Sequence, residues 1–360
     1  MNKPHCLCPT PATARVALVY KALDSRRAHY FGLGITASMT AKTLRRHGIW
    51  AEVWPAADAG QLRGRLVRTI AEALARRVLE PTHIVVLAPW LETADVASLA
   101  SDFPDITFTV VSHSTFGFLG ADPHAVRLLH ELVDLQHATS NVRVAGNAEK
   151  WTRVAGEIWS TNVTTLPNLY DTSEPMAVHR QPWPRDCLRV GLFGAGRILK
   201  NGTTAAAAAA LLAATHRVPV DLYISTDVDT GGIASPIREL VEGTPNLRIV
   251  DAGWLPWPRF RKLVGHMHLL LQPSYTESFN VVTADGIWAG VPTVASTAID
   301  WVPGRWQANP DDATDVARVG EYLLHCPHSI IEGRRVLEQI VTRGVESWKN
   351  FLAPRLASAA

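Results

Sequence analysis

Two carboxylates eight residues apart, Glu277 and Asp285, are the side chains whose types and spacing most clearly suggest chemistry. They lie in the segment 268–296, HLLLQPSYTESFNVVTADGIWAGVPTVAS. Its apolar start predicts a strand buried on both faces, and residues 279–289 have a helical pattern that Gly290 closes. Glu277 would lie on the loop before this helix and Asp285 about two turns further along. Because free N–H groups at a helix start bind anions, the site suits a ligand with both hydroxyls and phosphates.

The elements around these carboxylates belong to an alternation of strands and helices along the whole chain. That alternation predicts parallel sheets built from βαβ units, in which ligands bind at the carboxyl ends of the strands. The chain has 360 residues, of which 47% are hydrophobic, so it can form two domains with separate cores. Strands are predicted at residues 15–20, 50–54, 83–88, 107–113, 141–145, 164–167, 188–193, 220–225, 247–250, 269–271 and 293–296.

Other segments that follow predicted strands also carry residues suited to binding. A Gly-x-Gly loop at residues 32–34 precedes a predicted helix over 35–47, an arrangement typical of phosphate binding. His113 opens a polar loop after an apolar strand. Arg197 and Lys200 follow another strand, where Arg would bind a diphosphate bidentately and Lys would act as a point charge. A nucleotide sugar carries the hydroxyls and phosphates that these residues would bind.

The segment with the two acids resembles the signature of retaining glycosyltransferases of family 4. In that family a Glu, seven residues and a second Glu precede an Ala-x-Gly-x-Pro turn, and here Asp285 takes the place of the second Glu. The resemblance covers nearly the whole chain. The motifs occur in the family's order: Gly32 and Gly34, His113, the Pro167-Asn168-x-x-Asp171 run, Arg197 and Lys200, Gly253, and Glu277.

The resemblance implies an α/β protein with the GT-B fold, two Rossmann-like domains facing across a nucleotide-sugar cleft. It implies an N-terminal acceptor domain over residues 1–172, a linker at 173–186 and a nucleotide-sugar domain over 187–343. The linker is Pro-rich and lacks periodicity. Residues 344–360 would form a last helix that crosses back to the first domain.

The resemblance also assigns roles to single residues. His113 would reach the donor sugar, Glu277 would hold sugar hydroxyls, and Asp285 would bind the ribose. Arg197 and Lys200 would stabilise the leaving diphosphate, although only two residues separate them where the family usually has four. The reaction would be hexosyl transfer with retention at the anomeric carbon, without an essential metal. Further donor contacts are implied for Gly32, Gly34, Ser278, Phe279, Asn280 and Val281. Contact with the nucleotide base is implied for Gly253, Trp254 and Leu255.

The charge distribution bears on the acceptor. The net charge is +2, but residues 1–79 carry +9 and the remainder −7. This basic N-terminal segment predicts an anionic acceptor, with arginines at positions 63, 65, 68, 76 and 77 in one helical segment. Residues 112–124 resemble compact phage-encoded glycosyltransferases, some of which modify hydroxymethylated bases in DNA. Such an enzyme would flip the base out and bind phosphates with Arg and Lys. The alternative acceptor is a cell-envelope lipid or polysaccharide.

Other features narrow the class of protein. No segment has the roughly 20 apolar residues of a membrane span, and no signal peptide is evident, so a cytoplasmic protein is expected, in the host cytoplasm if it is phage-encoded. The four cysteines are too scattered for a disulfide framework. Both UDP- and GDP-sugars fit as the donor, and the sequence carries no signal for an oligomeric state. A sugar-nucleotide epimerase and a non-catalytic nucleotide-sugar-binding protein are the alternatives from other classes.

Overall fold

The computed structural model describes residues 14–22, 32–76, 80–173, 186–216, 218–227, 229 and 231–353. Its contacts divide the chain into two compact units. The first contains residues 1–113, 124–169 and 343–360, and the second contains residues 114–123 and 170–342. The predicted linker at residues 173–186 falls mostly on residues outside the described ranges. The sequence did not predict that the short segment 114–123 groups with the second unit.

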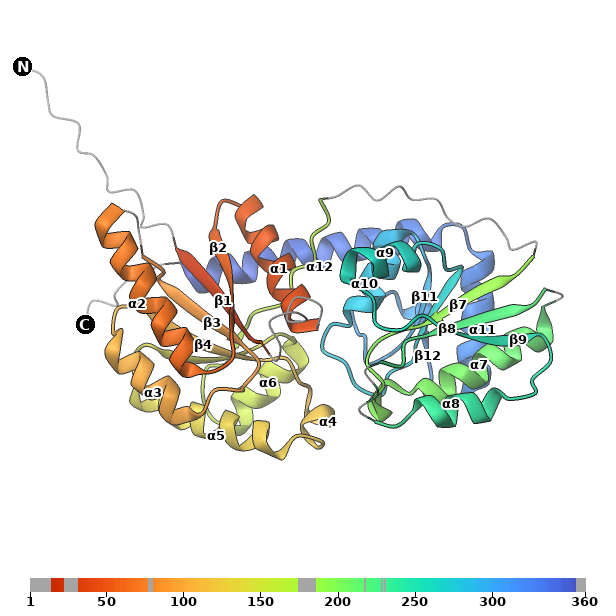
Figure 1. Cartoon of the computed structure of the whole chain (residues 1–360), viewed down its shortest axis with the longest axis horizontal. Helices are drawn as coiled ribbons and strands as arrows, with labels where there is room; N and C mark the ends of the chain where they lie inside the picture. The colour runs from red at the N-terminus through yellow and green to blue at the C-terminus, as the bar shows by residue number, and fades with distance from the viewer. Residues whose placement is uncertain are drawn as a thin grey trace, which may run out of the picture. The chain divides into compact units, whose positions relative to one another are not determined.

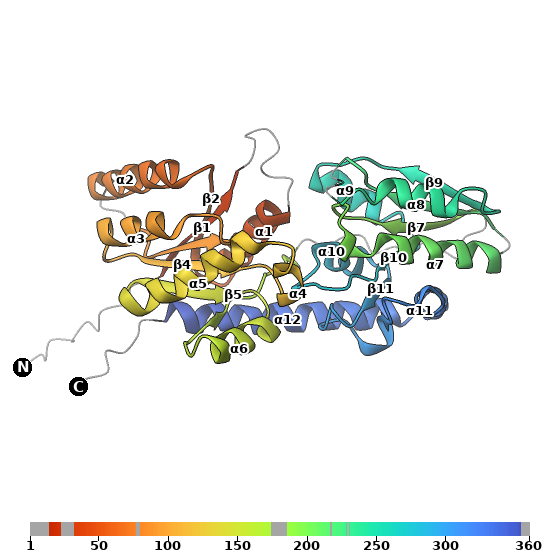
Figure 2. The same ribbon diagram turned by 90° about the horizontal axis from the view of Figure 1, so that it is seen from below.

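The first unit is built on a six-stranded parallel sheet with the order β2-β1-β3-β4-β5-β6. Helices cover both faces of this sheet (Figure 2). The strands are β1 (Arg15–Lys21), β2 (Trp50–Ala56), β3 (His83–Leu87), β4 (Thr107–Ser112), β5 (Val142–Gly146) and β6 (Thr164–Thr165). The helices are α1 (Gly32–Arg46), α2 (Ala59–Arg76), α3 (Thr93–Asp102), α5 (Pro123–Ala138) and α6 (Glu149–Ile158).

The second unit is built on another six-stranded parallel sheet, with the order β12-β11-β10-β7-β8-β9. Helices α9 and α10 lie on one face, and α7 and α8 on the other (Figure 1). The strands are β7 (Leu188–Leu192), β8 (Val220–Ile224), β9 (Leu247–Asp251), β10 (Leu269–Gln272), β11 (Thr293–Ser296) and β12 (Gln307–Ala308). The helical elements are α4 (Phe116–Leu119), η2 (Ile198–Lys200), α7 (Gly202–Thr215), α8 (Ala234–Val241), α9 (Trp257–Val264), α10 (Val281–Ala289), η3 (Gly304–Trp306), α11 (Ala313–His325) and α12 (Ser329–Leu352).

The last helix, α12, contributes to the core of the first unit. Val345, Trp348 and Leu352 are buried there with β1 and α1, and the Trp348 indole N–H donates to the Pro167 carbonyl at 2.9 Å. The α12 residues up to position 342 group with the second unit instead. Among the residues that the structure describes, no helix is long and apolar enough to cross a membrane.

The strand predictions are confirmed, with ends that differ by one or two residues. The two-residue strand β12 was missed, because the sequence predicted no strand after residue 296. The prediction that Gly32 and Gly34 lie in a loop was wrong, since both lie in the first turn of α1. Neither residue has a positive φ, so helical backbone suits them. The helix predicted from about residue 279 starts two residues later, at Val281, because Asn280 caps α10 from outside the helix.

Two glycines set how α10 packs on the sheet. A Cβ added at Gly286 would lie 2.5 Å from the Leu270 side chain and 2.8 Å from Thr293 Oγ1, so a larger residue would force these buried side chains to shift. Gly290 ends the helix with φ 78°, the left-handed conformation typical of a C-terminal glycine. Strand β11 therefore follows α10 closely and pairs with β10.

Candidate active site

Glu277 lies in the loop between β10 and α10, at the carboxyl edge of the second sheet. Its Oε1 accepts hydrogen bonds from Ser274 Oγ at 3.0 Å and Asn280 Nδ2 at 3.1 Å, and it forms an ion pair with Lys200. Within the described part of the chain, Oε2 has no such partner. The Glu277 side chain is 10% exposed. One carboxylate oxygen is thus fixed by the protein while the other is available to a ligand hydroxyl.

Asn280 shapes the start of α10. Its backbone is left-handed at φ 63°, which asparagine tolerates better than most residues, and its Oδ1 accepts from the Thr283 N–H at 2.9 Å. Its Nδ2 also donates to Gln272 Oε1 at 3.0 Å, and Gln272 Nε2 donates to the Phe193 carbonyl at 3.0 Å. This chain of hydrogen bonds connects the ends of β7 and β10 to the helix that follows Glu277.

The neighbouring residues of the predicted donor set surround this helix start. The Phe279 side chain is buried and stacks on Trp301, with ring centroids 5.4 Å apart, and the Phe279 carbonyl accepts from the Trp301 indole at 2.6 Å. Ser278 precedes Phe279 in the loop, and Val281 begins the first turn of α10. First-turn N–H groups carry partial positive charge, so the backbone at these positions forms an electropositive edge beside Glu277.

The structure brings the segment with the two cations to the same place. Lys200 forms the ion pair with Glu277. Asn201, left-handed at φ 58°, donates from Nδ2 to the Pro273 carbonyl at 2.9 Å, and the Tyr275 N–H donates to the Leu199 carbonyl at 3.0 Å. The loop after β7 and the loop after β10 are therefore held together by backbone contacts as well as by charge.

The segment 114–123 also contacts these loops, which the sequence did not indicate. Thr115 caps α4 and its hydroxyl is hydrogen-bonded to the hydroxyl of Thr276, the residue before Glu277. A Cβ added at Gly117 would lie 3.2 Å from Thr276 Oγ1. The Arg197 guanidinium lies 5.3 Å from the ring centroid of Phe118. No local pattern reveals such contacts, since Thr115 and Thr276 are 161 residues apart.

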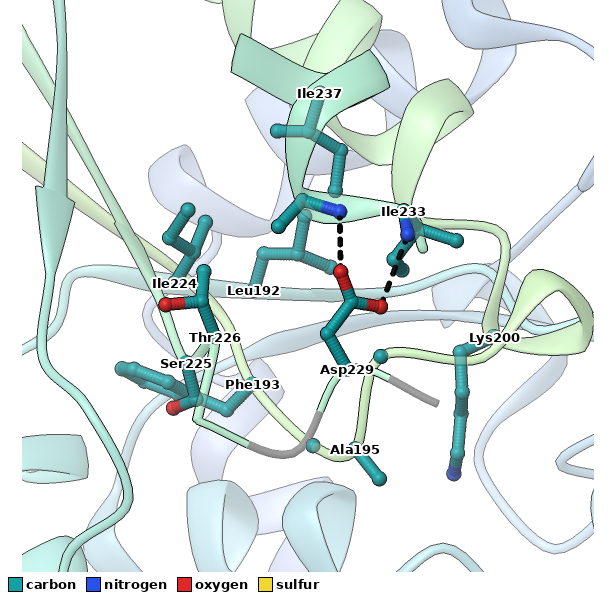
Figure 3. A pocket seen from close by; sticks show the side chains of 14 residues that line it. Leu192, Phe193, Ala195, Lys200, Ile224, Ser225, Thr226, Asp229, Ile233 and Ile237 are labelled. Carbon is teal, nitrogen blue, oxygen red and sulfur yellow. Dashed lines mark hydrogen bonds between the residues drawn. The ribbon is translucent and has the colours of Figure 1, made fainter. Parts of the chain in front are cut away.

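A small pocket opens at the carboxyl ends of β7 and β8 (Figure 3). Lys200 lines it, together with the glycine-rich turn after β7 and with Ser225, Thr226 and Asp229, which sequence reasoning missed. Asp229 accepts from the N–H groups of Ile233 and Ala234, each at 2.9 Å. These backbone hydrogen bonds, led by that of Ala234, lower the pKa of Asp229. Asp229 thereby occupies the anion position at the start of α8, while the Lys200 ammonium pairs with Glu277.

The predicted base-contact residues form a loop after β9. Gly253 has φ 61°, and its N–H donates to Asp251 Oδ1 at 3.1 Å. The Trp254 N–H donates to Asp227 Oδ2 at 2.8 Å, and Leu255 follows half-buried. Two carboxylates therefore fix the backbone of this loop. Contact of Gly253, Trp254 and Leu255 with a base stays a prediction.

Asp285 is held differently from Glu277. It is 1% exposed on α10, and burial raises its pKa to about 6 against the opposing effect of hydrogen bonds from Tyr170 and Trp257. The Tyr170 hydroxyl donates to Oδ1 at 2.6 Å, and the Trp257 indole donates to Oδ2 at 3.2 Å. Both oxygens of Asp285 are therefore engaged by protein groups, and its predicted contact with a ribose is untested.

The remaining predicted residues belong to the first unit. His113 directly follows β4, and its Nδ1 lies 3.3 Å from Asn147 Nδ2. Burial lowers the pKa of His113 to about 4, so its imidazole is neutral at pH 7. Gly32 is exposed and Gly34 is buried in the first turn of α1. Donor contacts of these three residues stay predictions. In the described ranges, no group of three or more His, Cys, Asp or Glu side chains could hold a metal ion.

Comparisons with known proteins identify the fold. No family model matches the chain, and no curated protein sequence matches it. Among solved structures, the chain is similar to the N-terminal domain of a Candida albicans trehalose-6-phosphate phosphatase, with TM-score 0.66, 10% identity and 98% of each chain covered. A Thermosynechococcus elongatus sucrose-phosphate synthase is similar with TM-score 0.64 and 15% identity, with 94% of this chain and 98% of that chain covered. A UDP-forming α,α-trehalose-phosphate synthase from Burkholderia xenovorans is similar with TM-score 0.60 and 12% identity, with 96% of this chain and 100% of that chain covered. At these identities the likeness establishes the fold, which is GT-B with two Rossmann-like units, as predicted.

Proposed function

We propose that this protein is a retaining glycosyltransferase that takes its sugar from a UDP-sugar donor. The observation that carries the proposal is Glu277, with one carboxylate oxygen fixed by Lys200, Ser274 and Asn280 and the other available beside the start of α10. A GT-B neighbour that is itself UDP-forming supports UDP over GDP. The resemblance to family 4 supports retention.

The reaction would be driven by stabilising the charge that develops as the diphosphate leaves. Glu277 Oε2 accepts a hydrogen bond from a sugar hydroxyl and orients the anomeric carbon. Lys200, Arg197 and the first-turn N–H groups of α10 stabilise the departing diphosphate. Groups held in place before the reaction give the largest catalytic effect, because they need no rearrangement as charge develops.

The acceptor in this proposal is an anionic molecule of the sugar-phosphate kind. The names of the neighbouring synthases support a sugar phosphate. Two of the arginines of α2 give less support to nucleic acid than the sequence suggested, while Arg77 lies outside the described residues. Arg63 forms an ion pair with Asp102 and donates to Ser98, and the Arg65 guanidinium lies 4.7 Å from the Trp54 ring centroid. These two arginines are already used within the first unit.

The test is nucleotide release from a panel of UDP- and GDP-sugars. Each donor is incubated alone and with a hexose phosphate, with hydroxymethylated DNA, or with a membrane-lipid extract. We expect UDP release from a UDP-sugar that depends on the hexose phosphate. Release that depends on DNA and falls with salt would favour the phage-type acceptor, and release that depends on lipid would favour a cell-envelope acceptor.

Two outcomes would contradict the transferase. Binding of UDP without release from any donor would indicate a non-catalytic binding protein. Conversion of the donor to another nucleotide sugar without an acceptor would indicate an epimerase. Nuclear magnetic resonance of the product's anomeric proton separately tests retention.

A further inference from the structure

Asp285 is a buried titratable group that the proposed mechanism does not use. The Tyr170 hydroxyl and the Trp257 indole donate to its two oxygens at 2.6 Å and 3.2 Å. Arg261 Nε lies 3.8 Å from Oδ1 and compensates its charge. Because Asp285 is only 1% exposed, a ribose hydroxyl could reach the carboxylate only if the groups packed around it moved.

The partners of Asp285 come from separate segments of the second unit. Trp257 and Arg261 lie on α9, which directly follows the loop of residues 253–255. Asp285 lies on α10, which follows Glu277. The chain passes from the first unit to the second between Leu169 and Tyr170. Leu169 is buried in the core of the first unit, and Tyr170 belongs to the second. The Asp285 carboxylate thus links three parts of the second unit: α9, which follows the loop of residues 253–255, α10, which follows Glu277, and Tyr170.

The chemistry of the cluster favours a permanent contact over a ligand contact. Tyr170 is fully buried and Asp285 is 1% exposed. A buried carboxylate is costly unless it is paired and hydrogen-bonded, and here a hydroxyl, an indole and a guanidinium meet it. The Arg261 guanidinium also lies 4.7 Å from the Trp257 ring centroid, which fixes its own position. Removing any donor would leave a buried acceptor unsatisfied.

We propose that Asp285 is a positioning residue that ties α9, α10 and Tyr170 together and holds the donor site in shape without touching the nucleotide. The inference rests on the proposed function, because these loops form a donor site only if the chain binds a nucleotide sugar. It differs from the role that the resemblance implies for this position, which is a direct contact with the ribose.

The test compares four full-length proteins: wild type, Tyr170→Phe, Asp285→Asn and the double variant. Calorimetry gives the dissociation constants of UDP and 2′-deoxy-UDP, and urea titration gives the unfolding equilibrium. We expect each single variant to weaken UDP binding by a similar factor of about three to ten, with the double variant no weaker than the worse single one. The preference for UDP over 2′-deoxy-UDP should stay within about twofold of wild type in every variant. Tyr322→Phe and Asp134→Asn, both exposed, are the matched controls.

The opposite results would overturn the inference. If Asp285 bound the ribose, Asp285→Asn would lose the preference for UDP over 2′-deoxy-UDP while Tyr170→Phe kept it. Independent, multiplying effects of the two substitutions would also overturn it, as would unchanged affinity in both. If Asp285→Asn does not fold, Trp257→Phe removes a single donor and takes its place in the comparison. If wild type binds no UDP, the UDP-sugar function fails. In that case, non-additive effects of the two substitutions on the free energy of unfolding would show that Tyr170 and Asp285 act together, and additive effects would show that they do not.

Discussion

At the scale of the residue, the two acids of the sequence motif have different environments and should respond differently to amide substitution. Glu277→Gln keeps the shape of the side chain but removes the charge that pairs with Lys200 and holds the sugar hydroxyl. We expect kcat/KM for a UDP-sugar to fall by about 100-fold or more, while the dissociation constant of UDP, which lacks the sugar, changes little. Steady-state kinetics and calorimetry measure the two effects. Glu346→Gln, on the exposed side of α12, is the control, and equal loss of UDP binding would contradict the assigned role.

Asp285 gives a prediction about pH. Its folded-state pKa of about 6 lies above the ordinary value of 3.8, so the folded protein binds its proton more tightly than the unfolded chain does. The stabilisation is complete below about pH 4 and is lost as the pH rises through about 6, by on the order of 3 kcal/mol. Tyr170 and Arg261 face the carboxyl, and Asp171 lies near Tyr170. The difference in unfolding free energy between wild type and Asp285→Asn should therefore fall over this interval. A flat difference would contradict the raised pKa.

The sequence indicated where Lys200 and Glu277 lie along the chain, but not all of the residues that contact them, and the roles of both stay predictions. The carboxyl ends of parallel strands share one edge of a sheet, so residues that follow β7 and β10 can meet there. The Lys200–Glu277 ion pair shows that they do. The contacts of Thr115 with Thr276 and of Phe118 with Arg197 depend on packing between distant segments. Nothing in the local pattern of residues 114–123 specifies those partners.

At the scale of the element, Asn280 determines where α10 begins. The apolar pattern suggested a start at Phe279, but the left-handed backbone of Asn280 interrupts the helix and its side chain caps the first turn. Strand ends were predicted well because apolar runs end at polar loops. The strand β12 has two residues, and so short a run has no periodicity to detect. A helix start that depends on the φ of one residue, as at Asn280, likewise cannot be detected in a hydrophobicity pattern.

Asn280→Ala therefore tests the start of α10. Alanine loses the cap and pays the steric cost of φ 63°, so we expect a loss of about 2 kcal/mol in unfolding free energy, measured by urea titration. Asn280→Gly removes the same side chain but tolerates this backbone, so it should lose less. Both variants also free Glu277 from its Asn280 hydrogen bond and should lower kcat. Equal destabilisation by Ala and Gly would show that the backbone conformation is not the determinant.

At the scale of the whole molecule, the end of the chain stabilises the sheet at its beginning. Val345, Trp348 and Leu352 of α12 complete a core that includes Val16 and Leu18 of β1. The first unit therefore depends on residues that follow the whole of the second unit in sequence. The sequence predicted that the last helix packs on the first domain only through its resemblance to GT-B proteins. The apolar face of a helix does not by itself indicate which of two sheets it covers.

This dependence predicts a local effect for a substitution in α12. Trp348 is 2% exposed and its indole donates to Pro167, so Trp348→Ala should cost about 3–5 kcal/mol in the stability of the first unit. Hydrogen exchange should become faster for amides of β1, β3 and β4, while amides of β7, β8 and β10 keep their protection. Lys349→Ala, 43% exposed on the next position, is the matched control and should change neither group. Equal loss of protection in both sheets would mean that the two units unfold as one, because the packing of α12 would then be linked to the second core as strongly as to the first.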